Sequence, residues 1–194
     1  MTDIFLRWWP ESDLRRLLGE AVIARLALQT DGRVHVLAAR ESRPPRRKTA
    51  TEAFLERDNF QARSRIVADS MARSQVYVLI DDDHLPIGKD WIQRGVSTLL
   101  QNPDYAMLSA WSINGEVRDP GGEGDIFETQ SAGTPCFVRK GTFEQVPYGP
   151  ADSYDSKLSD HLRGTIGRIG FLRNVRFNHL GCGYSQVVAG HWGA

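Results

Sequence analysis

Apolar residues follow one another without polar alternation from Val76 to Ile80. A run of β-branched, aromatic and leucine residues is typical of a strand that is buried on both faces of a parallel sheet. Near the N-terminus the spacing is instead helical. Ser12 is suited to cap a helix, and apolar residues then recur every three or four positions up to about Leu28: Leu14, Leu17, Leu18, Ala21 and Val22. The pattern thus predicts a buried strand and an amphipathic helix.

Two further strands flank that helix. The first is predicted from Ile4 to Trp9 and is ended by Pro10. The turn Asp31-Gly32 then leads into a short strand from Val34 to Ala38. Strand, helix and strand in succession predict a βαβ unit with a right-handed crossover, and hence parallel strands.

The rest of the chain continues to alternate between helices and strands. Residues 114–125 carry four glycines and a proline, which predicts a long loop of the kind that often acts as a lid. The other predicted elements are a helix from Asn59 or Gln61 to Arg73, a helix from Asp90 to Leu100, a strand from Tyr105 to Trp111, a strand from Gly133 to Arg139, a helix beginning near Asp152 and a strand from Asn174 to Phe177.

Composition places the chain among ordinary globular proteins. With 194 residues, 41% hydrophobic and 25% charged, it is long enough for one domain with its own core. Lys+Arg and Asp+Glu both number 24, so net charge argues neither for nor against a polyanionic partner. Cys136 and Cys182 lack metal-type spacing and are expected to be free thiols. Because no signal peptide or membrane-spanning run is evident, we expect a cytoplasmic protein.

Three consecutive carboxylates, Asp81 to Asp83, follow the buried strand directly. Adjacent like charges are costly unless something positive neutralises them, and a hard divalent cation bound through oxygen commonly does so. In open α/β sheets, ligands collect outside the carboxyl ends of strands, where this triplet would lie. The triplet therefore indicates a metal or phosphate site. The alternative is that these aspartates cap the next helix or face solvent.

A basic, proline-broken segment covers residues 40–48, Arg-Glu-Ser-Arg-Pro-Pro-Arg-Arg-Lys. Its composition predicts a loop. The loop could be a solvated surface segment, or it could form an electropositive edge for a ligand that carries phosphate.

Several separated features also occur in a distinctive order. A helix with arginines precedes the aspartate-ending strand, an aromatic residue and a glycine-led strand follow, and an acidic helix start precedes a strand that ends in His-Leu-Gly. The residues concerned are Arg63, Arg65, Asp81 to Asp83, Trp91, Arg139, Asp152, Asp155 and His179.

This order resembles that of the GT-A fold glycosyltransferases, most closely the inverting family 2 type, over nearly the whole chain. The resemblance implies an α/β fold, namely a single Rossmann-like domain over residues 1–194 with a central mixed, mostly parallel sheet flanked by helices. Residues 1–113 would form the part that binds a nucleotide sugar. Residues 114–194 would form the part that binds the acceptor and carries the catalytic base.

The resemblance also assigns the donor-site residues. Asp83, with His179 and Asp81, would hold a Mn²⁺ or Mg²⁺ ion that bridges the diphosphate of the nucleotide-diphosphate sugar. Asp81 or Asp82 would touch the ribose. The nucleotide would further be contacted by a group of flanking residues, Arg63, Arg65, Trp8 and Trp9. Taken alone, a histidine such as residue 179 at the end of a strand is more often an ordinary surface or core residue.

The attacking hydroxyl of the acceptor must lose its proton to a carboxylate. By resemblance this general base would be Asp155 or, failing that, Asp152. Taken alone, these aspartates would be expected to cap a helix and to favour its dipole.

The resemblance implies transfer of one sugar to an acceptor hydroxyl with inversion at the anomeric carbon. The acceptor is left open among a glycan, a small molecule, a protein and DNA. The Gln-x-x-Arg-Trp signature of processive synthases is missing, which favours a single addition. Two alternatives remain, a sugar-phosphate nucleotidyltransferase and a DNA-binding protein or DNA-base glycosyltransferase that uses residues 40–48.

Overall fold

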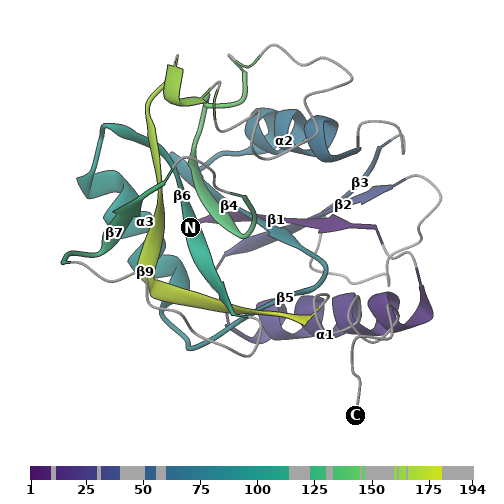
Figure 1. Ribbon diagram of the computed structural model, residues 1–194. Helices are drawn as coiled ribbons and strands as arrows, with labels where there is room; N and C mark the ends of the chain where they lie inside the picture. The colour runs from purple at the N-terminus through teal and green to yellow at the C-terminus, as the bar shows by residue number, and fades with distance from the viewer. Residues whose placement is uncertain are drawn as a thin grey trace.

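Helices and strands alternate along the first half of the chain in the computed structural model (Figure 1). The structure describes residues 1–9, 12–29, 32–39, 51–55, 60–113, 123–129, 133–144, 146, 160, 162–164 and 166–180. The elements are β1 (Asp3–Trp8), α1 (Asp13–Gln29), β2 (Arg33–Ala39), β3 (Thr51–Leu55), α2 (Phe60–Met71), β4 (Val76–Asp81), β5 (His84–Pro86), α3 (Trp91–Gln101), β6 (Tyr105–Ile113), β7 (Ile126–Glu128), β8 (Cys136–Arg139) and β9 (Arg168–His179).

The described strands form one mixed sheet of nine strands in the order β3-β2-β1-β4-β8-β6-β9-β5, with β7 paired to β9. The first four strands in this order are parallel. β8 runs antiparallel to both β4 and β6, whereas β6 and β9 are parallel. The sheet thus confirms the α/β class and the mixed sheet that the sequence analysis expected.

Side chains alternate across the central strands and build a core on each face of the sheet. Ile4, Leu6 and Trp8 of β1 face one core, which receives apolar residues from α1 and α3. Phe5 faces the other core, which receives Ala68 from α2. Figure 1 shows α1 and α2 on opposite sides of the sheet. β4 is buried on both faces, as its unbroken apolar run predicted.

Most predicted elements are confirmed, with limited shifts at their ends. The strand predicted from Asn174 to Phe177 is longer, since β9 begins at Arg168. Three short strands, β3, β5 and β7, were not predicted. The basic segment 40–48, most of the glycine-rich segment and the helix start at Asp152 lie outside the described residues. Among the described helices, none combines the length and apolar character needed to cross a bilayer.

Candidate functional site

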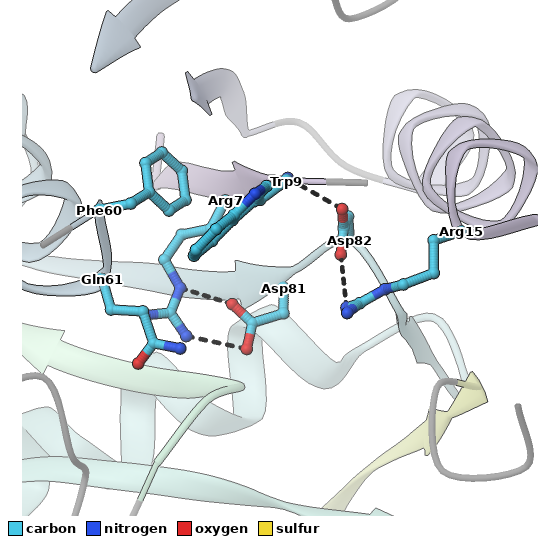
Figure 2. A pocket seen from close by; sticks show the side chains of 7 residues that line it. All are labelled: Arg7, Trp9, Arg15, Phe60, Gln61, Asp81 and Asp82. Atoms are coloured by element: carbon cyan, nitrogen blue, oxygen red, sulfur yellow. Dashed lines mark hydrogen bonds and ion pairs between the residues drawn. The ribbon is translucent and has the colours of Figure 1, made fainter. Parts of the chain in front are cut away.

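The candidate site lies at the carboxyl end of β4, where Asp81 ends the strand and the next two aspartates form the turn into β5. Because β1 and β4 are parallel neighbours, their carboxyl ends meet at the same edge of the sheet. A pocket opens at this edge. Figure 2 shows the side chains that line it, which are Arg7, Trp9, Arg15, Phe60, Gln61, Asp81 and Asp82.

Arg7 and Asp81 form an ion pair in this pocket because they are register partners on β1 and β4. The guanidinium donates two hydrogen bonds to the carboxylate, from Nε to Oδ1 at 2.5 Å and from Nη2 to Oδ2 at 2.8 Å. Thr134 accepts a hydrogen bond from Arg7 at 2.8 Å and donates one to Asp81. Burial alone would raise the pKa of Asp81, but Arg7 outweighs burial, and the pKa lies below its ordinary value.

Trp9 and Phe60 form an aromatic wall of the pocket. Their ring centroids lie 5.6 Å apart and the rings are inclined at 70°. Trp8, which the resemblance had also placed in a base pocket, lies instead in the core and is fully buried. The reason is strand alternation, since Trp8 shares its face with Ile4 and Leu6 while Arg7 shares the pocket with Trp9.

Asp82 is held from two sides. The backbone N–H of Trp9 donates to its Oδ2 at 3.0 Å, and Nη2 of Arg15 donates to its Oδ1 at 3.0 Å. Burial, helped by the neighbouring Asp81 and Asp83, outweighs the lowering effect of Arg15 and the Trp9 N–H and raises the pKa of Asp82 to about 6. The middle carboxylate of the triplet therefore lacks full compensation by positive charge in this arrangement.

Asp83, His84 and His179 place three potential metal-ligand atoms within 4.8 Å of one another. The two histidines are register partners on the antiparallel strands β5 and β9, and their rings stack with centroids 4.2 Å apart. The N–H of Leu180 donates to the backbone oxygen of Asp83 at 2.8 Å, which ties the end of β9 to the turn. The structure thus brings Asp83 and His179 together, as the sequence analysis expected.

The geometry of this trio fits a divalent cation. His84 Nδ1 lies 2.9 Å from Asp83 Oδ1, and His179 Nε2 lies 3.2 Å from Asp83 Oδ2. Ligand atoms that share one ion at about 2.1 Å lie roughly 3 to 3.5 Å apart. The contact between Asp83 Oδ1 and His84 Nδ1 is close but lacks the angles of a hydrogen bond, and within the described part of the chain neither buried atom has another hydrogen-bond partner. An ion would satisfy both atoms.

The charge state of Asp83 also suits a metal ligand. Burial alone would raise the pKa of this carboxyl. The imidazoles of His179 and His84 outweigh that effect, so the pKa of Asp83 lies well below its ordinary value. The group is therefore an anion at neutral pH, the form that binds cations.

The other predicted site residues lie differently. Arg63 is exposed and Arg65 is buried, both on α2, and neither is among the described residues that line the pocket. From this helix the pocket receives Phe60 and Gln61 instead. The predicted metal role of Asp81 stays a prediction, since both of its oxygens accept hydrogen bonds from Arg7. The candidate general bases, Asp152 and Asp155, lie outside the described residues.

Three site residues were not found by sequence reasoning: Arg7, Arg15 and His84. Arg7 precedes the tryptophan pair in a strand that looked simply apolar, and Arg15 sits among the solvent-facing positions of its helix. For His84 a signal existed, because it directly follows the aspartate triplet, and a histidine adjoining carboxylates is a common metal-ligand arrangement.

Comparison with known proteins establishes the fold. No protein-family model matches this sequence, and no curated protein sequence matches it. Among solved structures, 92% of the chain superposes on TarS 1–349 from S. aureus with a TM-score of 0.59 and 12% identity, and on the same fragment in complex with UDP with a TM-score of 0.60. It also superposes over 92% of its length on GalNAc-T7 with UDP, GalNAc and Mn²⁺, with a TM-score of 0.65 and 11% identity.

These likenesses define the class of fold as GT-A-type, the fold that the sequence resemblance implied. Structural likeness at such low sequence identity shows the fold but does not show the reaction. The chain spans 60% of the TarS fragment and 43% of the GalNAc-T7 structure.

Proposed function

We propose that the protein is a metal-dependent glycosyltransferase that moves one sugar from a nucleotide-diphosphate sugar to an acceptor hydroxyl with inversion. The observation that carries the proposal is the position of the trio Asp83, His84 and His179 beside the aromatic and acidic pocket, at the edge of a GT-A-type sheet. The presence of UDP in structures of TarS and GalNAc-T7, and of Mn²⁺ in the latter, supports the same class of donor.

Donor binding would use the pocket that Figure 2 shows. The base would pack against the Trp9 and Phe60 rings, and the Gln61 amide offers it hydrogen bonds. The ribose hydroxyls would be bound by Asp82 and Asp81. Arg7 keeps Asp81 ionised and fixed in one orientation, so that less ordering is needed when the donor binds.

Asp83, His84 and His179 would hold Mn²⁺ or Mg²⁺ beside the donor diphosphate. When bound, such an ion stabilises the negative charge that develops on the departing diphosphate. The acceptor oxygen attacks the anomeric carbon while the bond from that carbon to the diphosphate oxygen breaks. A carboxylate takes the hydroxyl proton, and we assign this role to Asp155 or Asp152. In this proposal residues 1–113 bind the donor and residues 114–194 bind the acceptor.

A thermal-shift screen of UDP-, GDP-, CMP- and dTDP-sugars, each with and without Mn²⁺, tests the proposal. A ligand that binds only the folded state at 100 times its dissociation constant adds about 2.7 kcal/mol of stability. For a chain of this size the melting temperature would rise by roughly 5 to 10 °C. We expect such a shift with one donor class, and only when Mn²⁺ is present.

Two variants make this experiment specific. Asp83→Asn should abolish the shift and the release of nucleoside diphosphate in the presence of an acceptor. Asp90→Asn, which changes an exposed aspartate at the start of α3, should leave both unchanged. Pyrophosphate release from a nucleoside triphosphate, with no response to any nucleotide sugar, would instead identify a nucleotidyltransferase.

A further inference from the structure

Arg15 lies between Asp82 and Asp83, the second and third carboxylates of the aspartate triplet. Its backbone N–H is fixed by the side-chain oxygen of Ser12 at the start of α1, at 3.2 Å. From there a single nitrogen, Nη2, donates to Asp82 Oδ1 at 3.0 Å and to Asp83 Oδ2 at 2.9 Å. One guanidinium thus bridges two consecutive aspartates.

The charges around this contact are unevenly matched. Arg7 pairs with Asp81, whereas Arg15 pairs with both Asp82 and Asp83. Counting these five side chains alone, the three aspartates carry one negative charge more than the two arginines balance. A divalent ion would turn this small excess into a positive one, which suits a diphosphate.

The same geometry would place the Arg15 guanidinium close to a bound ion, so that the two positive charges repel each other. Asp83 Oδ2 is the atom that contacts both Arg15 Nη2, at 2.9 Å, and His179 Nε2, at 3.2 Å. An ion bound between Asp83 and His179 would therefore lie a few ångströms from a second positive charge, and like charges at that distance repel strongly in a partly buried site.

The Arg15 guanidinium is accessible from the pocket. Its side chain is 24% exposed and lines the pocket. Asp82 keeps the hydrogen bond from the Trp9 N–H when the guanidinium moves. A guanidinium binds phosphate oxygens as readily as carboxylates, often with two parallel hydrogen bonds.

We propose that Arg15 is an internal counter-cation of the donor site. It balances Asp82 and Asp83 in the free protein, weakens the binding of a divalent ion alone, and turns to the donor diphosphate when the ion and the donor bind together. Ion and donor consequently bind with positive coupling, and Arg15 is a positioning residue for the leaving group. This inference rests on the proposed function for its second step only.

Isothermal titration of Mn²⁺ into the protein, with and without UDP, GDP or dTDP, tests the inference. Arg15→Ala should bind Mn²⁺ alone about tenfold more tightly than the wild type, since a neighbouring positive charge is gone. It should bind the Mn²⁺–nucleoside diphosphate pair about tenfold more weakly. Because coupling between two ligands is reciprocal, the coupling factor should fall by about a hundredfold whichever ligand is titrated first.

Matched variants control this experiment. Arg16→Ala removes the neighbouring exposed arginine, which pairs with Asp13, and should change none of these constants. Arg15→Lys keeps the charge and should restore weak binding of Mn²⁺ alone. If Arg15→Ala fails to fold by circular dichroism, Arg15→Gln, which is neutral but keeps a long polar side chain, serves as the test variant.

The possible failures are distinguishable. Unchanged or weaker Mn²⁺ binding by Arg15→Ala, with nucleotide binding intact in the wild type, would overturn the counter-cation role alone. If the wild type binds no nucleoside diphosphate with or without Mn²⁺, the proposed function and the transfer of Arg15 to a diphosphate both fail. Tighter Mn²⁺ binding by Arg15→Ala would then still support the first step.

Discussion

Among single residues, His84 has the largest expected effect on which ion the site binds. With His179 it supplies two imidazole nitrogens beside one carboxylate. Transition-metal ions, Mn²⁺ included, accept nitrogen ligands more readily than Mg²⁺, which prefers an all-oxygen octahedron. We predict that the wild type binds Mn²⁺ more tightly than Mg²⁺. His84→Asn should weaken Mn²⁺ binding by about tenfold or more, which corresponds to a ligand that contributes about 1.4 kcal/mol. It should also reduce the difference in affinity between Mn²⁺ and Mg²⁺. Isothermal titration measures both affinities.

His35→Asn is the control for this prediction, because His35 stacks on Phe5 and contacts Asp3 away from the site. It should keep the preference for Mn²⁺. Equal affinity of the wild type for Mg²⁺ and Mn²⁺ would contradict an imidazole-containing ligand set.

Asp3, at the start of β1, is expected to matter for stability and not for binding. It is fully buried, and its carboxylate accepts hydrogen bonds from Arg33 and from the backbone N–H groups of Arg73 and Ser74 at 2.6 to 2.9 Å. In Asp3→Asn, the side-chain NH₂ group would face N–H groups that need an acceptor. The substitution should therefore lower the free energy of unfolding, measured by urea denaturation at neutral pH, by about 3 kcal/mol. Asp13→Asn, at an exposed position, should change stability by less than about 0.5 kcal/mol.

The same residue gives a pH dependence with a definite sign. Burial would raise the pKa of Asp3, but the hydrogen bonds from Arg33, His35 and the backbone outweigh it and hold the pKa well below 3.8. As the pH falls, Asp3 is therefore protonated at a higher pH in the unfolded chain than in the folded protein, and the stability that its carboxylate contributes decreases. The stability difference between wild type and Asp3→Asn should be constant from about pH 7 to 5 and should shrink below about pH 4. A constant difference down to pH 3 would contradict this linkage.

At the scale of elements, Gly95 allows α3 to pack closely against β8. A Cβ atom at Gly95 would lie 2.2 Å from the Phe137 ring, which is itself fully buried and packed against Trp91. We predict that Gly95→Ala lowers the unfolding free energy by about 1 to 3 kcal/mol through overpacking, although alanine is the better helix former by about 1 kcal/mol. Thermal or urea unfolding provides the measurement.

Gly164→Ala is the matched substitution, since no atom of the described residues lies within 4 Å of a Cβ at that position. It should be neutral or slightly stabilising. If both substitutions have the same effect, contact with Phe137 is not what requires a glycine at position 95.

The elements also show what a single sequence can and cannot specify. β4 and α1 follow from local pattern alone, because burial on two faces and an apolar stripe each leave a periodic trace. β5 leaves none: three residues, His-Leu-Pro, form a strand only because β9 lies alongside to pair with them. β9 was predicted too short for a related reason, since its first half pairs with β6 and β7, which are remote in sequence.

At the scale of the whole molecule, the same limit applies to the site. The aspartate triplet was evident because its three charges are adjacent in sequence. Arg7 and Arg15 were not, because their approach to Asp81 and Asp83 depends on the register of β1 against β4 and on the side of the sheet that α1 covers. The resemblance to a known fold was sufficient to predict His179. It placed Trp8 on the wrong face of β1, because a resemblance in the order of elements does not specify which residues of a strand face the pocket.

The candidate metal site joins two distant parts of the chain, since Asp83 in the turn after β4 and His179 at the end of β9 are separated by 96 positions. An ion held by both must dissociate before the end of β9 can separate from the turn after β4. We therefore predict that Mn²⁺ slows amide hydrogen exchange in β5 and in β9 near His179, including the Leu180 N–H that donates to Asp83. At 100 times the dissociation constant, exchange through such openings should slow by up to about a hundredfold.

β3 is the internal control for this experiment, because it lies at the other edge of the sheet and should exchange by local fraying that leaves the site intact. His179→Ala should abolish the protection by Mn²⁺ while the chain remains folded, because the remaining ligands lie on the turn and on β5 alone. Protection that persists in His179→Ala would mean that the ion does not join these strands. Slowing of β3 to the same extent as β9 would mean that exchange proceeds through global unfolding, and that the cation stabilises the sheet as one cooperative unit.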